Sequence, residues 1–321
     1  MKRCWVAIAT LAVLGAFGAL AQTFAPAPVD SIVMPRLEIE DHEEGPMFSA
    51  AVAAAPAAPW TPADLGASLA LWLDADDAST IALNGTTVSQ WDDKSGNGNH
   101  VSNGTAATQP EYLAAGWNGK PTLSFTETGQ EFLFKTGVSN YASNSDFTLA
   151  GAFEFLQIVR QWDMIAGWRN IANSSGSSGG VPILQGMSNA QEIGYHNTDQ
   201  IDTRIAVSVT NRTGKKIATI SRSGGTNGNG GDATVTSTGW SQPTYITNAT
   251  QTWSSASSTG FQVGGKQQSA TQYGSKYISE VVGCNTKLST DDRQKLEGYL
   301  AHKWGLEADL PADHPYKVSP P

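Results

Sequence analysis

Short apolar or alternating runs, separated by turn residues, follow one another along the chain from Trp60 onward. Each run is bounded by Gly, Asn, Ser or Pro, which is typical of β-strands between turns. Many short strands without intervening helical patterns indicate a β-sandwich or a barrel. The runs are Pro121–Phe125, Glu131–Phe134, Phe147–Phe155, Ile205–Val209, Lys216–Ile220, Ala233–Thr236 and Tyr277–Val282.

Two segments depart from this strand pattern. Leu65–Leu73 has apolar residues at helix-compatible spacing, which predicts a short helix there. A clearer helix begins at Ser289 or Thr290, since Ser289 is a suitable N-cap and two aspartates follow it. Its apolar residues recur at every fourth position up to Trp304, and Gly305 ends it. We expect this helix to pack on the sandwich.

The first 59 residues differ from the rest of the chain. Residues 1–21 combine a basic start, an uncharged apolar run and the small residues Ala19 and Ala21, which predicts a signal peptide; an uncleaved N-terminal anchor is the alternative. Residues 22–59 are rich in Ala and Pro with one acidic cluster, so we expect a linker or docking arm. Residues 60–321 then form the folded domain.

Charge limits the partners of this chain. Its net charge is −9, only 15% of its residues are charged, and it has no basic cluster. This composition excludes binding to nucleic acid by phosphate neutralisation. We expect membrane association only if the N-terminal segment stays uncleaved. Cys284 is alone in the body of the chain, which rules out an internal disulfide there and predicts a buried thiol.

Segments at both ends of the folded domain resemble one family. Near its start these are Trp72–Asp76, Val88–Asn99 and Asn118–Phe125; near its end they are Ile278–Val281, Leu288–Arg293, Leu296–Gly305 and Leu310–Tyr316. Together they resemble laminin-G-like or concanavalin A-like lectin jelly-roll domains of bacterial extracellular and phage structural proteins. The resemblance spans roughly residues 60 to 317. It implies an all-β fold: a two-sheet antiparallel jelly-roll sandwich, with the C-terminal helix packed on it. It also implies binding of glycans or proteins, often with calcium.

Catalytic motifs are missing from the sequence. A retaining glycosidase needs two carboxylates about 5 Å apart, and no Glu-x-Asp-x-x-Glu strand motif supplies them. No Gly-x-Ser-x-Gly elbow sits at an expected strand-to-helix turn, and the histidines have no metal-ligand spacing. We therefore predict that the protein is not an enzyme, with a glycoside hydrolase of concanavalin-like fold as the weakest alternative.

The run Asp92–Asn99 offers oxygen atoms at alternating positions, as calcium loops do. Asp92, Asp93 and Asn97 are the candidate calcium ligands. The position where an EF-type loop has its bidentate Glu holds Gly104. The alternative is a tight turn held by Asx hydrogen bonds. Calcium is the one cofactor that the sequence suggests.

Aromatic residues among polar turn residues are the candidates for ligand contact. Sugar rings stack on exposed aromatic rings while Asn, Gln and Asp bind the hydroxyl groups. Trp240, Trp253 and Tyr195 have such neighbours. Trp72, Trp91 and Trp304 belong to the segments that carry the resemblance, and we expect them in the core.

The sequence supports two main functions. The first is a secreted or cell-surface, lectin-like adhesion module, which binds a glycan or a surface protein outside the cell. The second is a structural protein of a phage or virus, with the sandwich displayed outward from the virion and residues 22–59 docking on other virion proteins.

Overall fold

The computed structural model describes residues 58–138, 146–157, 163–169, 183–187, 192–196, 204–208, 213–223, 232–238, 244–247, 260–265 and 274–321. The chain divides into two units, Met1–Ala55 and Pro56–Pro321, and every described residue lies in the second.

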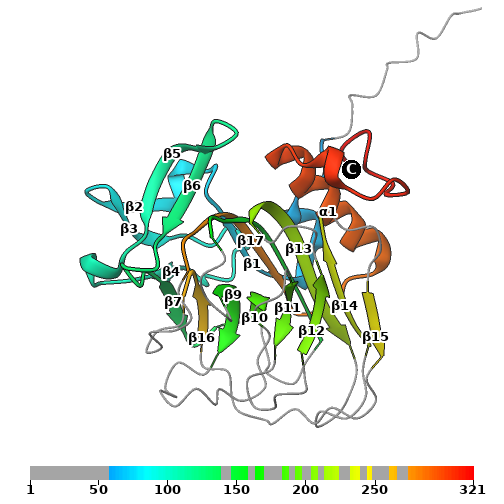
Figure 1. Ribbon diagram of the computed structural model, residues 1–321, viewed down its shortest axis with the longest axis horizontal. Coiled ribbons are helices and arrows are strands. Elements are labelled where there is room, and N and C mark those ends of the chain that lie inside the picture. Colours follow the sequence, from blue (N-terminus) through cyan, green and yellow to red (C-terminus); the bar gives the residue numbers. More distant parts are fainter. Residues whose placement is uncertain are drawn as a thin grey trace, which may run out of the picture. The chain divides into compact units, whose positions relative to one another are not determined.

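The described residues form mainly β-strands, followed by one α-helix near the C-terminus (Figure 1). A 3₁₀ segment, Pro62–Ser68, precedes the first strand. The strands are β1 Leu69–Asp74, β2 Ile81–Asn84, β3 Thr87–Trp91, β4 Val101–Ser102, β5 Glu111–Trp117, β6 Lys120–Phe125, β7 Leu133–Thr136, β8 Phe147–Phe155, β9 Asp163–Arg169, β10 Ile183–Met187, β11 Glu192–His196, β12 Arg204–Ser208, β13 Gly214–Ser223, β14 Asp232–Ser237, β15 Thr244–Thr247, β16 Gly260–Val263 and β17 Lys276–Cys284. The helix α1 spans Thr290–Trp304.

The named strands pair antiparallel in two series. One series runs β15–β14–β13–β8–β17–β1. The other runs β12–β11–β10–β9–β16–β7–β4–β3–β2. The β5–β6 hairpin joins them, because β5 pairs with β3 and β6 pairs with β17.

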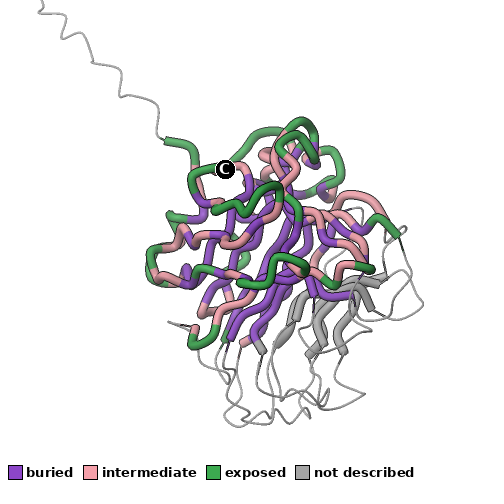
Figure 2. Tube along the Cα trace, turned by 90° about the vertical axis from the view of Figure 1, so that its left-hand side faces the viewer, coloured by how far each residue is buried: buried purple, intermediate pink, exposed green. Residues whose placement is uncertain are grey.

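Two apolar cores cover the two faces of the first series. The larger core lies between the series, because residues of β1, β8 and β17 pack there with residues of β9 and β16. The second core lies between the first series and α1. Strand β8 shows the division: Leu149 and Phe153 face the first core, whereas Ala150 and Ala152 face the second. Because an apolar core covers each face of the first series, its central strands are buried, as Figure 2 shows.

The helix α1 has the ends that its sequence predicts. The Ser289 hydroxyl accepts a hydrogen bond from the Asp292 backbone N–H at 3.1 Å, and Gly305 ends the helix with a φ of 70°. Leu296, Leu300 and Trp304 are each 0% exposed and form part of the second core.

The main predictions of architecture are confirmed: an antiparallel all-β fold with one C-terminal helix packed on it. The jelly-roll strand order remains a prediction. The helix predicted over Leu65–Leu73 is wrong in its second half, because Leu69–Asp74 is strand β1. Every residue of β1 is buried, since the strand is covered on both faces, and such a strand lacks the alternating pattern that marks a half-exposed one.

The structure confirms the predicted burial of four residues. Trp72, Trp91 and Trp304 are core residues, and Cys284 is buried. Burial raises the pKa of the Cys284 thiol to about 12, so this thiol stays protonated at neutral pH. Within the described ranges, no helix is long and apolar enough to cross a membrane.

Candidate functional site

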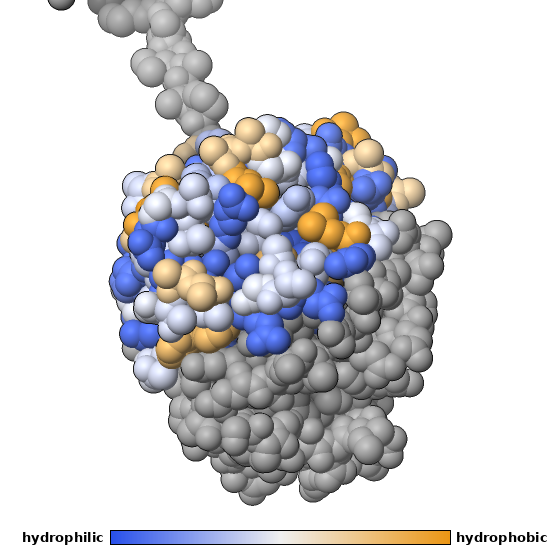
Figure 3. All heavy atoms as spheres, turned by 60° about the vertical axis from the view of Figure 1, so that its left-hand side comes forward, coloured by the Kyte–Doolittle hydropathy of each residue, from blue (hydrophilic) through white to orange (hydrophobic). Residues whose placement is uncertain are grey.

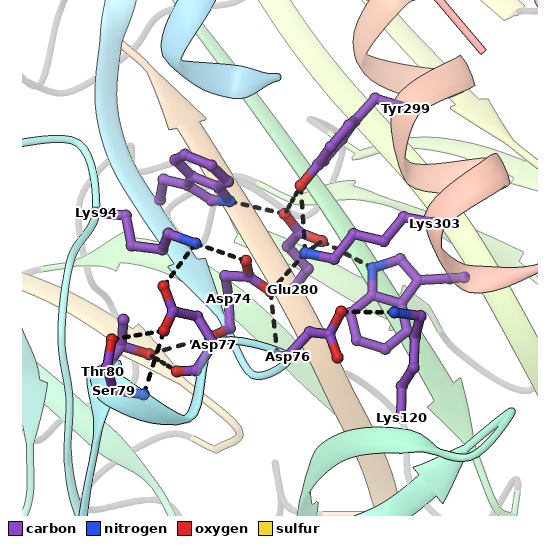
Figure 4. Close-up of polar contacts among 12 residues, drawn as sticks. Asp74, Asp76, Asp77, Ser79, Thr80, Lys94, Lys120, Glu280, Tyr299 and Lys303 are labelled. Carbon is purple, nitrogen blue, oxygen red and sulfur yellow. Dashed lines mark hydrogen bonds and ion pairs between the residues drawn. The ribbon is translucent and has the colours of Figure 1, made fainter. Parts of the chain in front are cut away.

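Charged side chains from distant parts of the chain meet where β1, β17 and α1 come together (Figure 4). We call this group the charged cluster. It consists of Asp74, Asp76, Asp77, Lys94, Lys120, Glu280, Tyr299 and Lys303, with the indole rings of Trp72 and Trp304 beside them.

Glu280 is the centre of the charged cluster and is 0% exposed. One carboxylate oxygen, Oε1, accepts hydrogen bonds from Trp72 Nε1 at 2.7 Å and from the Tyr299 hydroxyl at 3.1 Å. The other, Oε2, accepts from Trp304 Nε1 at 2.8 Å and lies 2.9 Å from Lys303 Nζ. Burial raises the pKa of Glu280, and the charge of Asp74 adds to this rise while Lys303 opposes it.

Asp74 lies directly opposite Glu280 on the neighbouring strand, since the two residues are register partners of β1 and β17. Opposed residues of an antiparallel pair have Cβ atoms about 5 Å apart on one face of the sheet. Lys303 Nζ contacts both carboxylates, at 2.5 Å from Asp74 Oδ1 and 2.9 Å from Glu280 Oε2. Strand pairing thus brings two carboxylates together, and no local sequence motif predicts this pair.

The outer part of the charged cluster is half-exposed. Lys94 Nζ bridges Asp74 and Asp77 at 2.9 Å each, and Lys120 Nζ binds Asp76 at 2.6 Å. Burial opposes the charge of Lys94, but its two aspartate partners outweigh this and raise its pKa. We call the four half-exposed residues Asp76, Asp77, Lys94 and Lys120 the charged rim.

Aromatic rings lie next to the charged rim. The Lys94 ammonium is 4.3 Å from the centroid of the Trp72 ring, and the Lys120 ammonium is 6.0 Å from that of Trp304. Tyr299 and Trp60, both half-buried, meet edge to face with their centroids 5.9 Å apart. Ammonium groups over aromatic faces are held by cation–π attraction.

The predicted calcium ligands make the hydrogen bonds of a turn. Asp93 Oδ1 accepts from the backbone N–H groups of Trp72 and Ser95, and Asp93 Oδ2 accepts from that of Asn99, each at 2.9 Å. Asp92 Oδ1 accepts from Gln90 at 2.7 Å.

The remaining turn contacts show what the turn does. The Asn97 amide donates to the carbonyl of Leu69 at 2.9 Å, and the Asn99 amide donates to that of Ala70 at 2.8 Å. The turn therefore covers the β1 edge opposite β17. No group of three or more His, Cys, Asp or Glu side chains within the described ranges is arranged to hold a metal ion. Calcium binding stays a prediction.

The three aromatic residues predicted to contact a ligand are not members of the charged cluster. Trp240 and Trp253 lie outside the described residues. Tyr195 belongs to β11, where its backbone pairs with Leu184 and Ile205. Its side chain is not among those described.

Sequence reasoning missed the charged cluster as a unit. None of Asp74, Asp76, Asp77 and Glu280 is predicted as a site residue from the sequence. The structure joins them through lysines instead. The one available signal was the pair of family-like segments, since Trp72–Asp76 and Ile278–Val281 carry Asp74 and Glu280.

Comparison with known proteins gives likenesses of fold alone. No family model matches the sequence, and no curated protein matches it. Among solved structures, Trypanosoma rangeli sialidase in complex with sialic acid matches at 16% identity and a TM-score of 0.48, over 77% of this chain and 34% of the sialidase. A GH54 α-L-arabinofuranosidase soaked with a cyclic sulfate inhibitor matches at 10% identity and 0.49, over 68% and 51%. The binding domain of Paraclostridial Mosquitocidal Protein 1 matches at 10% identity and 0.47, over 76% and 53%.

These matches correct one prediction from the sequence. The missing motifs led us to expect a protein that is not an enzyme, whereas the sialidase and the arabinofuranosidase are enzymes. That expectation is overturned and is not retained. This chain spans about a third of the sialidase and about half of the other two. Likenesses this distant assign no activity to it. The laminin-G-like resemblance also stays a prediction.

Proposed function

We propose that residues 60–321 form a lectin-like domain that recognises glycan outside the cell, either from a secreted or cell-surface protein or from a virion. The observation that carries the proposal is the charged rim beside aromatic rings. Carboxylate and ammonium groups bind sugar hydroxyls, and aromatic rings pack on the apolar faces of sugars. Asp76 and Lys120 supply the first kind of group, with side chains 28% and 38% exposed, and Tyr299 supplies the second.

The character of the surface agrees with this proposal. On the face shown in Figure 3, hydrophilic residues surround small, separated hydrophobic patches. A surface of this kind suits a hydroxyl-rich ligand better than a broad apolar partner. Trp240, Trp253 and Tyr195 remain proposed ligand contacts, and Asp92, Asp93 and Asn97 remain proposed calcium ligands.

A glycan array followed by calorimetric titration tests the proposal, with the full chain and with calcium or chelator present. We expect the double variant D76A/K120A to lose at least tenfold in affinity for any glycan that the wild type binds. The matched control is D291A/K295A, which removes a surface ion pair of α1 and should bind as the wild type does.

The outcomes separate the two proposed contact regions. Binding that survives in D76A/K120A and is lost in W240A/W253A would move the site to those tryptophans. Binding lost in the control as well would show that the loss is not specific to the rim. A folded wild type that binds no glycan on the array, with or without calcium, would contradict the proposal.

The Asp74–Glu280 pair supports a second candidate function, glycoside hydrolysis. A retaining glycosidase needs two carboxyl groups about 5 Å apart, one of them with a raised pKa so that it can act as an acid. Asp74 and Glu280 are opposed on neighbouring strands, and burial raises the pKa of Glu280. A substrate would have to displace Lys303, which contacts both carboxylates.

Release of nitrophenol from a panel of nitrophenyl glycosides tests this candidate. We expect activity in the wild type and in D291A/K295A, and none in D74N or E280Q that remain folded by circular dichroism. A folded wild type that hydrolyses no glycoside of the panel would remove the candidate and leave the binding proposal standing.

A further inference from the structure

A lysine and an aspartate are sealed together inside the sandwich, away from the charged cluster. Lys276 and Asp163 have side chains 0% and 1% exposed. They begin strands β17 and β9, which belong to the two different strand series. Lys276 Nζ contacts Asp163 Oδ1, and it also donates to the backbone carbonyls of Gly264 at 2.6 Å and Met164 at 3.1 Å.

Aromatic residues flank Lys276 on the two neighbouring strands. Lys276 is the register partner of Phe125 on β6 and of Phe155 on β8. Cross-strand partners point to the same face of a sheet, so the lysine side chain runs between two phenylalanine rings that are 1% and 0% exposed. The amine and the carboxyl group are both buried from solvent.

The backbone leaves room for the aspartate. A Cβ atom added at Gly274 would lie 2.0 Å from Asp163 Oδ2, so the carboxyl group occupies the space that a side chain there would fill. Gly274 lies two residues before Lys276. The chain thus brings the carboxyl group against the segment that carries the amine.

Burial changes the chemistry of such a pair. An apolar site disfavours both charges, and transfer of one proton from the ammonium to the carboxylate gives a neutral amine and a neutral carboxylic acid. A neutral lysine amine is a nucleophile. The two groups touch and lie at the starts of β17 and β9, so the reaction between them is intramolecular and already oriented.

We propose that Lys276 and Asp163 form an intramolecular amide bond between Nζ and Cγ. After proton transfer, the amine nitrogen attacks Asp163 Cγ. The new C–N bond forms, the C–O bond of the carboxyl hydroxyl breaks, and that hydroxyl leaves with a proton from the nitrogen as one water molecule. An ammonium and a carboxylate thus become an amide and water, with no oxidant, reductant or co-reactant.

The cross-link would do what a disulfide cannot do in this chain. Cys4 and Cys284 are its only cysteines, and Cys284 is buried with a raised pKa. An amide between β9 and β17 ties the two strand series covalently, independently of redox conditions. It also removes two charges from the core, whose burial is costly.

Mass spectrometry of the full chain under denaturing conditions tests the proposal. We expect the wild type to be lighter than its sequence by the mass of one water, relative to the N-terminus found in the same experiment. Proteolysis should then yield a branched peptide that joins Lys276 to Asp163. A folded wild type at its full sequence mass, or a water loss mapped to another site, would overturn the proposal.

Two variants and one internal control sharpen the test. D163N should lose ammonia instead of water, because the leaving group is then an amide nitrogen. K276R should keep its full mass, and a K276R chain that still loses water at Asp163 would overturn the proposal. The Lys120–Asp76 pair is the internal control, since it has a similar contact at 2.6 Å but is half-exposed. No branched peptide is expected there, and one would show that cross-linking occurs without burial and so overturn the argument.

Discussion

At the scale of single residues, Glu280 shows how a buried charge is stabilised. Its four donors come from β1 and α1, namely Trp72, Tyr299, Lys303 and Trp304. A buried carboxylate is tolerated only when it is paired and hydrogen-bonded. Glu280 therefore fixes the positions of the strand and the helix relative to each other.

Replacing Glu280 with Gln should destabilise the fold by about 3–5 kcal/mol, because the change breaks a buried pair and points an amide N–H group at other donors. Urea denaturation followed by tryptophan fluorescence measures the change. K295A, which removes one partner of a surface pair, should leave the midpoint nearly unchanged. An E280Q midpoint equal to that of the wild type would show that the four donors do not stabilise the fold through this carboxylate.

The sequence predicts that some of these residues are buried, but it does not predict which of them lie next to each other. Trp72 and Trp304 were predicted as core residues from the segments they belong to, and both are buried. Asp74 and Glu280 are far apart in the chain, and only the register of β1 with β17 brings them together. Register depends on all the side chains that pack across a sheet, so no short motif encodes it.

At the scale of elements, the turn Asp92–Asn99 substitutes for a neighbouring strand. Its Asp93 carboxylate and its two asparagine amides bind backbone groups of β1 on the side away from β17. An open strand edge has unpaired backbone groups that can pair with other chains. The residues that suggested calcium therefore have a structural use in the absence of any metal.

D93A should cost about 1–3 kcal/mol of stability, because the backbone N–H groups of Trp72 and Asn99 lose their acceptor while buried. Urea denaturation with calcium and with chelator measures this cost. If the wild type has the same urea midpoint with calcium and with chelator, Asp93 stabilises the turn and does not bind calcium. A wild-type midpoint that rises with calcium, and a D93A midpoint that does not, would support the calcium prediction.

The helix α1 holds the C-terminal segment through Glu297. Burial opposes ionisation of Glu297, but the His314 imidazole 3.5 Å away, the charge of Arg293 and a hydrogen bond from Thr236 outweigh this and lower its pKa. Arg293 binds both carboxylate oxygens at 2.8 Å. A carboxyl group with a lowered pKa stabilises the fold above its unfolded pKa of about 4.3 and loses that contribution as the pH falls through its folded pKa.

We therefore expect the urea midpoint of the wild type to fall as the pH drops below about 4.3, and that of E297Q to fall less. A pH series of denaturation curves measures the difference. D291N is the matched control, because Asp291 lies on the same helix with its side chain 67% exposed. Parallel pH profiles for E297Q and the wild type would contradict this role of Glu297.

At the scale of the whole molecule, the fold follows from a sheet that is covered on both faces. Half-exposed strands show alternating apolar and polar residues or clear turn residues at their ends, so the sequence predicts several of them. The sequence predicts the helix from its N-cap, its apolar spacing and the glycine that ends it. Strand β1 is buried throughout, and β9 is buried over residues 163–168, so neither shows the alternation that marks a half-exposed strand. Asp163, which contacts Lys276 of β17, lies on β9.

The proposed cross-link makes a prediction about the stability of the whole domain. Asp163 and Lys276 are 113 positions apart. In the chain-entropy model, closing a loop of this length stabilises a protein by about 5 kcal/mol, because the unfolded chain loses freedom. A buried ion pair without a covalent bond behaves differently, since its replacement by apolar residues of similar size is often neutral or stabilising.

The double variant D163L/K276M separates these cases, because it removes both charges together and leaves neither group unpaired. If the amide bond forms, the variant should lose about 5 kcal/mol and its denatured chain should migrate more slowly than that of the wild type in reducing gels, since a closed loop makes a denatured chain more compact. Denaturation curves and gel mobility measure the two effects. A variant as stable as the wild type and equal to it in mobility would show that the two strand series are held together without a covalent bond at this position.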